Sequence, residues 1–446
     1  MADLFAVLMD QSIWLVIAVI ALSFFFIFGC TKLILRPAMV GSLDPLNIKL
    51  WFFLAPALTG FVLLPVLSGS FSPSFFVILF FITAWLLVIR IAGKPKKIDL
   101  RDKMEPDFQI ILLLLSIAII VANVVINMII PGKIPLLTEG GVNSRFEATE
   151  NSRLLTWISF GTAPMAGLIY AVTQNVRVRK VAVVAVILQA CESILFASKS
   201  GILTTVFILL NAWFVAKARK EESRSKEIKK IFVYVSVAIA LLSPFYLSVI
   251  GVGSGGTALG VVSLRFLAGF DQLIFAAHFD LLRHSGFDAA IGSNLFEYQL
   301  MPFFKSIFDV KYDYSSIGQY VVETVLGIYI DGPYTFPNSN LILETIFTSG
   351  RYLGFIFFIF ESFCFYWCRR IVLKRPVTHL SLILVGGTVL DPMGLFSSGQ
   401  EWVTEMVLRF LVIMFAWALA IAWSGIRVAF RSRPAMRSIK ESHDSC

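Results

Sequence analysis

Long apolar runs separated by short polar segments make up most of this chain. A helix needs ~20 apolar residues to cross a hydrocarbon core of ~30 Å, and backbone in lipid must satisfy its own hydrogen bonds. The pattern therefore predicts an all-α, polytopic transmembrane helical bundle of about eleven spans. We expect the spans near residues 11–29, 50–68, 73–92, 108–130, 154–173, 181–197, 201–217, 231–250, 341–367, 378–398 and 402–424.

One connection between the predicted spans is much longer than the others. It runs from Gly251 to Asn340 and holds about ninety residues, well beyond the usual loop length, which indicates a functional insertion or a small subdomain. The chain is thereby divided into a first group of spans (1–250), this long helical loop (251–340), and a C-terminal group of spans with a basic tail (341–446).

Residues 257–284 of the long loop have the periodicity of a helix with one polar face. That face consists of Arg265, Gln272, Ala276, Asp280 and Arg283. We interpret the segment as a helix lying at the membrane surface; an amphipathic lid held by packing alone is the alternative. In one straight helix, Arg265 and Arg283 would be about 27 Å apart. Either the helix breaks, with Gly269 the expected place, or the two arginines serve different ligands.

Composition agrees with a membrane protein, since 57% of the residues are hydrophobic and 15% are charged. The net charge of +9 could indicate a nucleic-acid partner, but the basic residues cluster between the spans. Such clusters mark the cytoplasmic side of a membrane protein. We therefore expect no nucleic-acid partner, a periplasmic N-terminus and a cytoplasmic C-terminus, with the segments 131–153 and 251–340 outside.

Several kinds of chemistry have no signature in the sequence. The five cysteines are scattered, no phosphate-binding loop, dinucleotide fingerprint or nucleophile elbow is present, and no group of His, Cys or carboxylates has ligand spacing. The acidic residues of Asp309 to Tyr314 do not form a close carboxylate pair and are expected in a solvated loop. The sequence predicts no metal, no cofactor and no ATP-driven transport.

The stretch "TFPNSNLILETIFTSGRYLG", residues 335–354, opens a predicted span with polar residues. Asn340, Glu344, Thr348 and Arg351 recur at helical spacing, so we expect them on one face that lines a cavity. Glu344 and Arg351 would be about 10 Å apart along the axis. Each therefore needs a partner on another element, or a ligand.

Outward-facing cations and hydrogen-bonding side chains indicate a site for an anionic ligand at the lipid boundary, because the arginine fork suits paired phosphate oxygens. For each histidine of this set, a structural role is the alternative to catalysis. The set comprises Arg145, Arg153, Lys199, Arg265, Arg283, Arg351, Asn338, Asn340, His278 and His284.

Three stretches carry a resemblance to a known family: "IPLLTEGGVNSRFE" (134–147), "ASKSGIL" (197–203) and "FPNSNLILETIFTSGRYLG" (336–354). Together with the long external loop, they make the chain similar to the polytopic O-antigen polymerases of the Wzy type. The resemblance implies a GT-C-like polymerase/ligase membrane fold in the bacterial inner membrane. It also implies inverting, metal-independent glycosyl transfer at the periplasmic face, between an undecaprenyl-pyrophosphate-linked glycan donor and acceptor. The implied partners are these glycans, membrane lipids and a chain-length regulator protein.

In the reaction that this resemblance implies, an acceptor hydroxyl attacks the anomeric carbon of the growing chain and lipid pyrophosphate leaves. Asp280, His278 and Glu344 are candidates for the base, and Arg265 and Arg283 for stabilising the leaving group. The expected substrate or pyrophosphate contacts are Arg145, Arg153, Lys199, Asn338, Asn340 and Arg351.

Two alternatives remain. O-antigen ligases resemble polymerases but typically carry a His-Asn pair where Ser339-Asn340 stands here. A lipid-linked sugar flippase or transporter should show related halves with broken helices near mid-membrane, and the sequence does not predict them. The arginine-to-glycine spacing described for some polymerases is also missing from the outer loops, which leaves open which arginines act.

Overall fold

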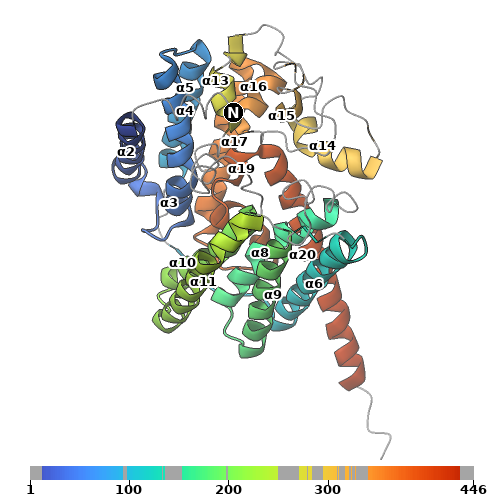
Figure 1. Cartoon of the computed structure of the whole chain (residues 1–446). Coiled ribbons are helices and arrows are strands. Elements are labelled where there is room, and N and C mark those ends of the chain that lie inside the picture. Colours follow the sequence, from blue (N-terminus) through green and yellow to red (C-terminus); the bar gives the residue numbers. More distant parts are fainter. Residues whose placement is uncertain are drawn as a thin grey trace, which may run out of the picture.

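The computed structural model describes residues 13–93, 98–132, 134–135, 153–196, 199–249, 271–278, 280–283, 295–308, 310, 317–320, 323, 327 and 340–431. Within these residues the secondary structure is helical, apart from one isolated bridge between Asp102 and Val377 (Figure 1). The all-α prediction is confirmed.

Five helical segments of the described chain are long and apolar enough to cross a membrane. They are Pro45–Val62, Pro73–Ala92, Pro106–Ile129, Leu154–Val172 and Gly399–Arg427. The chain is therefore a helical protein with the hallmarks of a membrane protein, and the count of about eleven spans stays a prediction.

One group of helices packs around a first apolar core, in the upper part of Figure 1. Trp85 stacks on Phe396 in this core, with ring centroids 4.1 Å apart. The group comprises α2 (Ile13–Gly29), η1 (Cys30–Ile34), η2 (Arg36–Ala38), α3 (Pro45–Lys49), η3 (Leu50–Leu54), α4 (Ala55–Ser68), α5 (Pro73–Ala92), α13 (Asp271–His278), η5 (Leu281–Arg283), α14 (Leu295–Phe308), α15 (Ile317–Tyr320), α16 (Leu341–Ser349), α17 (Arg351–Val372) and α19 (Gly394–Ser397).

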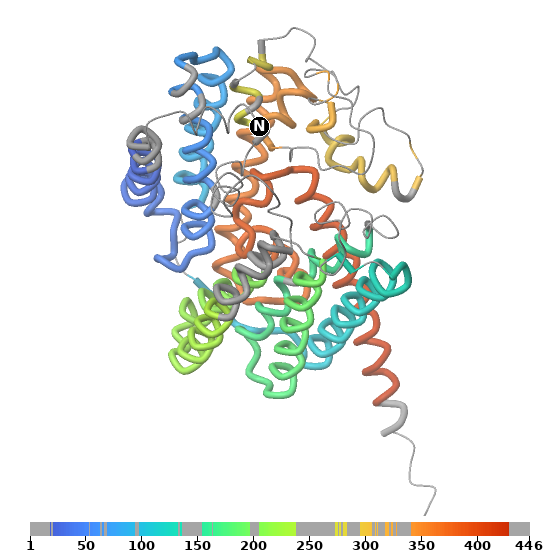
Figure 2. The backbone as a smooth tube through the Cα atoms, in the orientation of Figure 1, coloured from blue at the N-terminus to red at the C-terminus, as the bar shows by residue number. Residues whose placement is uncertain are grey.

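A second group packs around another apolar core, in the lower part of the same view. It comprises α6 (Pro106–Val124), α8 (Arg153–Val172), α9 (Val176–Leu195), α10 (Lys199–Ala218), α11 (Glu222–Val249), α18 (His379–Leu384), η7 (Val385–Leu390) and α20 (Gly399–Arg431), and η4 (Val125–Ile129) continues α6. The helix α20 connects the two groups, because it packs on α14 as well as on α6 and α8 (Figure 2).

Two predicted spans are interrupted. The segment 341–367 is two helices separated at Gly350, whose φ of +74° and ψ of 173° suit glycine alone. A Cβ on Gly354 would lie 2.5 Å from the carbonyl oxygen of Thr345, so α16 and α17 pack closely. The expectation that Arg351 shares one helical face with Glu344 is therefore wrong. The segment 378–398 is also interrupted, between η7 and α19.

The helix expected over 257–284 is interrupted as well. Its described part ends at His278, and Asp280 then adopts a left-handed φ of +48°, which Asp tolerates better than most residues. Gly269, the expected place of a break, lies outside the described residues. Ala276, expected on the polar face, is fully buried, because α13 packs on α4 and α5.

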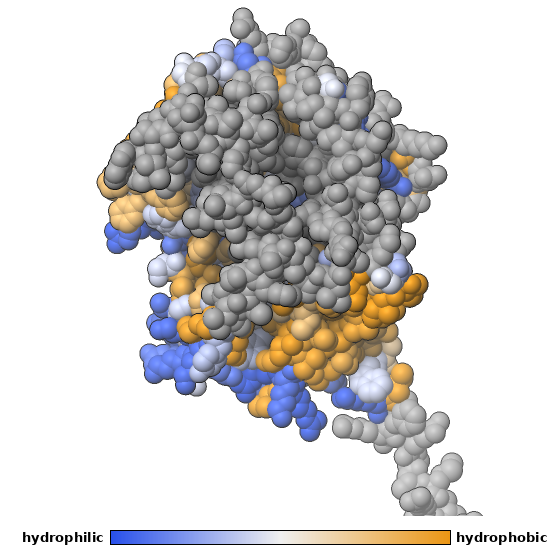
Figure 3. Space-filling model, viewed as in Figure 1, coloured by the Kyte–Doolittle hydropathy of each residue, from blue (hydrophilic) through white to orange (hydrophobic). Residues whose placement is uncertain are grey.

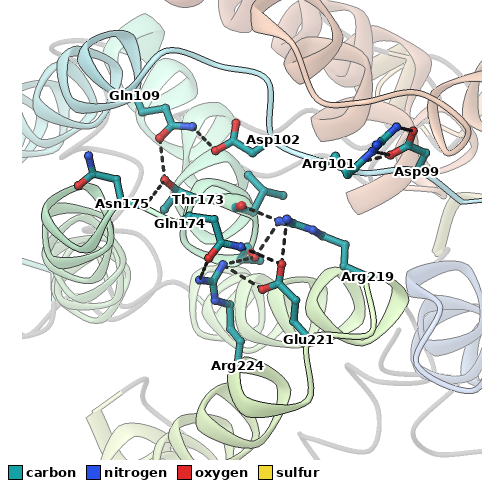
Figure 4. Close-up of polar contacts among 12 residues, drawn as sticks. Asp99, Arg101, Asp102, Gln109, Thr173, Gln174, Asn175, Arg219, Glu221 and Arg224 are labelled. Atoms are coloured by element: carbon teal, nitrogen blue, oxygen red, sulfur yellow. Dashed lines mark hydrogen bonds and ion pairs between the residues drawn. The ribbon is translucent and has the colours of Figure 1, made fainter.

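Four basic connections, α5–α6, α8–α9, α10–α11 and α17–α18, lie close together at one end of the molecule, as the charge pattern predicts, and Figure 4 shows residues of the first three. The backbone N–H of Asp99 donates to the carbonyl of Leu373 at 2.8 Å, which joins the α5–α6 and α17–α18 connections. Arg219 and Arg224 donate to the carbonyls of Val172 and Ala171, at 2.5 and 2.9 Å, and both contact Glu221. Hydrophilic residues also gather along the lower edge of Figure 3, below a hydrophobic band.

Candidate functional site

Glu344 is a fully buried carboxylate on α16. Asn340 begins this helix: its side-chain oxygen accepts from the backbone N–H of Ile342 at 2.9 Å, and its amide donates to the carbonyl of Phe396 at 2.9 Å. The Ser398 hydroxyl donates to Glu344 Oε1 at 3.3 Å. Asn340 and Glu344 thus connect α16 to the segment that precedes α20.

Helix α14, from the predicted external loop, adds a buried amide to this cluster. Gln299 Nε2 donates to the two carboxylate oxygens of Glu361, at 3.1 and 3.3 Å. A Cβ on Gly399 would lie 2.5 Å from Glu344 Oε2 and 3.0 Å from Gln299 Nε2. Because Gly399 has no side chain, Glu344 and Gln299 can approach each other across the start of α20. We call Glu344, Gln299, Glu361, Ser398 and Gly399 the carboxylate cluster.

A cavity of about 150 Å³ adjoins the carboxylate cluster through residues 397–401. Its volume admits several water molecules, or a hydroxylated group of a ligand. Lys49 and Asp391 form an ion pair in its wall. The polar and aromatic side chains that line this central cavity are Lys49, Asp391, Ser397, Glu401, Trp402 and Glu405.

The central cavity has more carboxylates than cations. Glu405 accepts from Arg409 Nη2 at 2.5 Å, and the buried Arg409 also donates through Nε to the carbonyl of Gly161 at 2.6 Å. Lys49 pairs with Asp391, whereas no ion pair of Glu401 occurs among the described residues. The side chain of Glu401 is exposed. Since charged groups inside a membrane bundle usually face a cavity, a partner or a ligand, this surplus carboxylate marks a candidate site.

The segment 391–398 between η7 and α20, which contains the short helix α19, is held in place by hydrogen bonds from several elements. Tyr366 Oη donates to the carbonyl of Pro392 at 2.9 Å, and Trp402 Nε1 donates to the carbonyl of Gly387 at 2.9 Å. Ser398 Oγ accepts from the backbone N–H of Glu401 at 3.2 Å. Open backbone inside a membrane bundle is tolerated where it is buried in protein or lines a cavity, and this segment does both.

Two of the predicted site residues lie together elsewhere. Asp280 Oδ1 accepts from the backbone N–H and the hydroxyl of Ser74, at 3.0 and 2.6 Å, and so caps the start of α5. Arg351 donates to the carbonyl of Leu282. These contacts tie the 280–283 turn to α5 and α17. The described partner of Arg351 thus lies on another element.

The remaining predicted site residues are described only by their backbone or lie outside the described residues. Only the backbone is described for four of them. Arg153 and Lys199 are the first residues of α8 and α10, and His278 and Arg283 are the last residues of α13 and η5. Arg145, Arg265, Asn338 and His284 lie outside the described residues.

Sequence reasoning missed most residues of the carboxylate cluster and of the central cavity. Glu361 in "FIFFIFESF" and the pair Glu405 and Arg409 in "VTEMVLRFLV" carried a usable signal, which is a charge inside an apolar run. Lys49 and Asp391 carried none, because 342 residues separate them in the chain.

A second buried polar cluster joins α6, α8 and α9. Glu192, which is 1% exposed, accepts from Asn123 Nδ2 at 2.6 Å, from Ser159 Oγ at 2.7 Å and from Gln189 Nε2 at 2.7 Å. Thr156 Oγ1 in turn donates to Asn123 Oδ1 at 3.0 Å. Hydrogen bonds between helices hold membrane helices together, and the bonds from Asn123 and Ser159 to Glu192 join α6 and α8 to α9.

Neither a protein-family model, nor a curated protein, nor a solved structure matches the chain.

Proposed function

We propose that the chain is a membrane glycosyltransferase that polymerises undecaprenyl-pyrophosphate-linked oligosaccharide repeat units into O-antigen or a related surface polysaccharide. The observation that carries the proposal is the position of Glu344. This acidic residue of the 336–354 stretch is buried in the carboxylate cluster, next to a charged cavity. The same stretch carries the resemblance to Wzy-type polymerases.

The proposed reaction needs a group that accepts a proton and groups that stabilise a departing pyrophosphate. The central cavity supplies carboxylates for the first task. For the second we assign the predicted arginines Arg265 and Arg283, with Arg145 next, because their forked guanidinium groups match phosphate oxygens. The proposed reaction uses neither a metal ion nor a cofactor.

The proposed orientation follows from the basic end of the molecule. Placing the four basic connections in the cytoplasm puts the C-terminus inside and the segments 131–153 and 251–340 in the periplasm. The eleven-span arrangement in the bacterial inner membrane then puts the N-terminus outside. A chain-length regulator would meet the enzyme at the periplasmic side.

Deletion of the gene, followed by a lipopolysaccharide gel, tests the proposed function. We expect core that carries a single repeat unit in place of a ladder, and a restored ladder from a plasmid copy. A Glu344→Gln copy should restore it poorly, whereas Glu105→Gln, a change at an exposed residue, should restore it fully. Bare core with accumulated lipid-linked polymer would instead indicate a ligase.

Transport of a lipid-linked sugar is a second candidate, favoured by the helix interruptions at Gly350 and at residues 391–398. Transporters place their sites at such interruptions, and the sequence did not predict them. Deletion would then leave unextended lipid-linked repeat units in the cytoplasmic leaflet. Purified protein would move these units between leaflets without lengthening them.

A further inference from the structure

We propose that Glu401 is the general base that takes the proton from the acceptor hydroxyl, and that the central cavity holds the acceptor sugar. The inference rests on the proposed polymerase function. The sequence instead predicts Asp280, His278 or Glu344 for this role.

The surroundings of the neighbouring carboxylates favour Glu401. Glu405 is paired with Arg409, and Asp391 is paired with Lys49. Glu361 accepts from Gln299. Glu401 lines the central cavity with an exposed side chain and has no ion pair among the described residues. A base must come within hydrogen-bond reach of the proton that it removes, and of these carboxylates Glu401 is the one least occupied by protein partners.

Two of the three predicted candidates, Glu344 and Asp280, are placed less favourably. Glu344 is 0% exposed and faces Ser398 and Gly399, and it does not line the central cavity. Asp280 is engaged in capping α5. Neither carboxylate is presented to the cavity.

Glu344 is instead a positioning residue for Glu401. Its carboxylate accepts from the Ser398 hydroxyl, and the oxygen of the same hydroxyl accepts from the backbone N–H of Glu401. This chain of two hydrogen bonds connects the 336–354 stretch to the first turn of α20. A buried glutamate without access to substrate can therefore still affect the reaction.

The proposed step balances without any further reagent. A carboxylate oxygen of Glu401 takes the hydroxyl proton while the acceptor oxygen forms its bond to the anomeric carbon of the donor. The bond from that carbon to the phosphate oxygen breaks, and its electron pair leaves with the lipid pyrophosphate. Glu401 then releases the proton to water. The ion-paired Lys49 and Asp391 offer hydrogen bonds to other sugar hydroxyls, and Trp402 offers an aromatic wall.

The test uses purified, membrane-reconstituted protein and lipid-linked repeat units, with the elongation rate as the readout. Glu401→Gln should lower the rate by a factor of about 10² to 10⁴, as removal of a general base does. Glu105→Gln is the matched control at an exposed glutamate outside the site. In the Glu401→Ala protein, added formate should enter the vacated space and raise the rate at least about tenfold, because it replaces the missing base.

The result that overturns the inference is a Glu401→Gln protein with an elongation rate close to that of the wild type. If Glu401→Gln does not fold, the role of Glu401 as base is tested by the formate experiment on Glu401→Ala or by the elongation rate of Glu401→Asp. A folded but inactive alanine variant that formate does not rescue would also overturn the role as base. Failure of the proposed function itself is distinguishable, since the wild-type protein would then make no polymer.

Discussion

Arg369 and Arg370 are chain neighbours at the end of α17 with different surroundings. Arg369 is 0% exposed, and its Nη2 lies 2.5 Å from Oδ1 of the equally buried Asp44. The carboxylate of Asp44 also accepts from the backbone N–H groups of Val40 and Leu46, at 2.8 and 2.9 Å. Arg370 is only partly buried.

This difference gives a prediction for stability. Arg369→Ala leaves an uncompensated buried carboxylate, so it should lower the free energy of unfolding by about 3–5 kcal/mol. Arg370→Ala should change it by no more than about 0.5 kcal/mol. Unfolding of the two purified variants in detergent measures both values. Equal losses would show that the Asp44–Arg369 pair is not a buried ion pair.

Individual residues of the site could be predicted from the sequence only where their polarity differs from that of their neighbours in the chain. Asn340 and Glu344 differ in this way, because they are polar at the opening of an apolar helix. Asp280 and Arg351 stood out equally, but their described contacts tie elements together. Glu401 and Lys49 could not be assigned to one site, because the segments that bring them together are far apart in the chain.

At the scale of elements, the contact between α16 and α17 depends on Gly354. A Cβ at this position would lie 2.5 Å from the Thr345 carbonyl oxygen and 3.1 Å from the Ile346 Cα. Gly354→Ala must therefore push the two helices apart, and overpacking of this kind costs about 1–3 kcal/mol.

The matched control is Gly425→Ala on α20, because a Cβ there meets no atom within 4 Å. Alanine is the better helix former, so this change should be neutral or stabilise by up to about 1 kcal/mol. Thermal unfolding of both variants compares them directly. A Gly354→Ala protein as stable as the control would contradict the close packing of α16 and α17.

Existence and type of the helices were predictable, but their interruptions were not. A run of ~20 apolar residues predicts a span, and Gly350 within such a run gives no sign that it adopts a φ of +74°. The break before α20 is set by hydrogen bonds from Tyr366 and Trp402 to backbone carbonyls. These are tertiary contacts, which local patterns do not encode.

At the scale of the whole molecule, the basic connections define one side. The sequence predicted this arrangement, because charges between spans mark the cytoplasmic face whatever the packing of the helices. How α14 reaches Glu361 from the long loop could not be predicted, since it depends on a contact across 62 residues of sequence.

The proposed orientation can be measured with single cysteines in a cysteine-free background. We expect a membrane-impermeant maleimide to label Lys305→Cys on α14 from the periplasmic side. Lys220→Cys, in the α10–α11 connection, should react only after the inner membrane is permeabilised. Both lysines are exposed, so accessibility within the protein does not limit labelling. The reverse pattern would invert the orientation and the assignment of the long loop.

The central claim is that this chain alone joins lipid-linked repeat units without metal or nucleotide. Its most direct test is mass analysis of the products that purified protein in liposomes makes from undecaprenyl-pyrophosphate-linked repeat units in excess EDTA. The account predicts a series of lipid-linked products that differ by one repeat unit, with release of undecaprenyl pyrophosphate. No product longer than the substrate, or elongation only after a divalent metal or a nucleotide sugar is added, would contradict it.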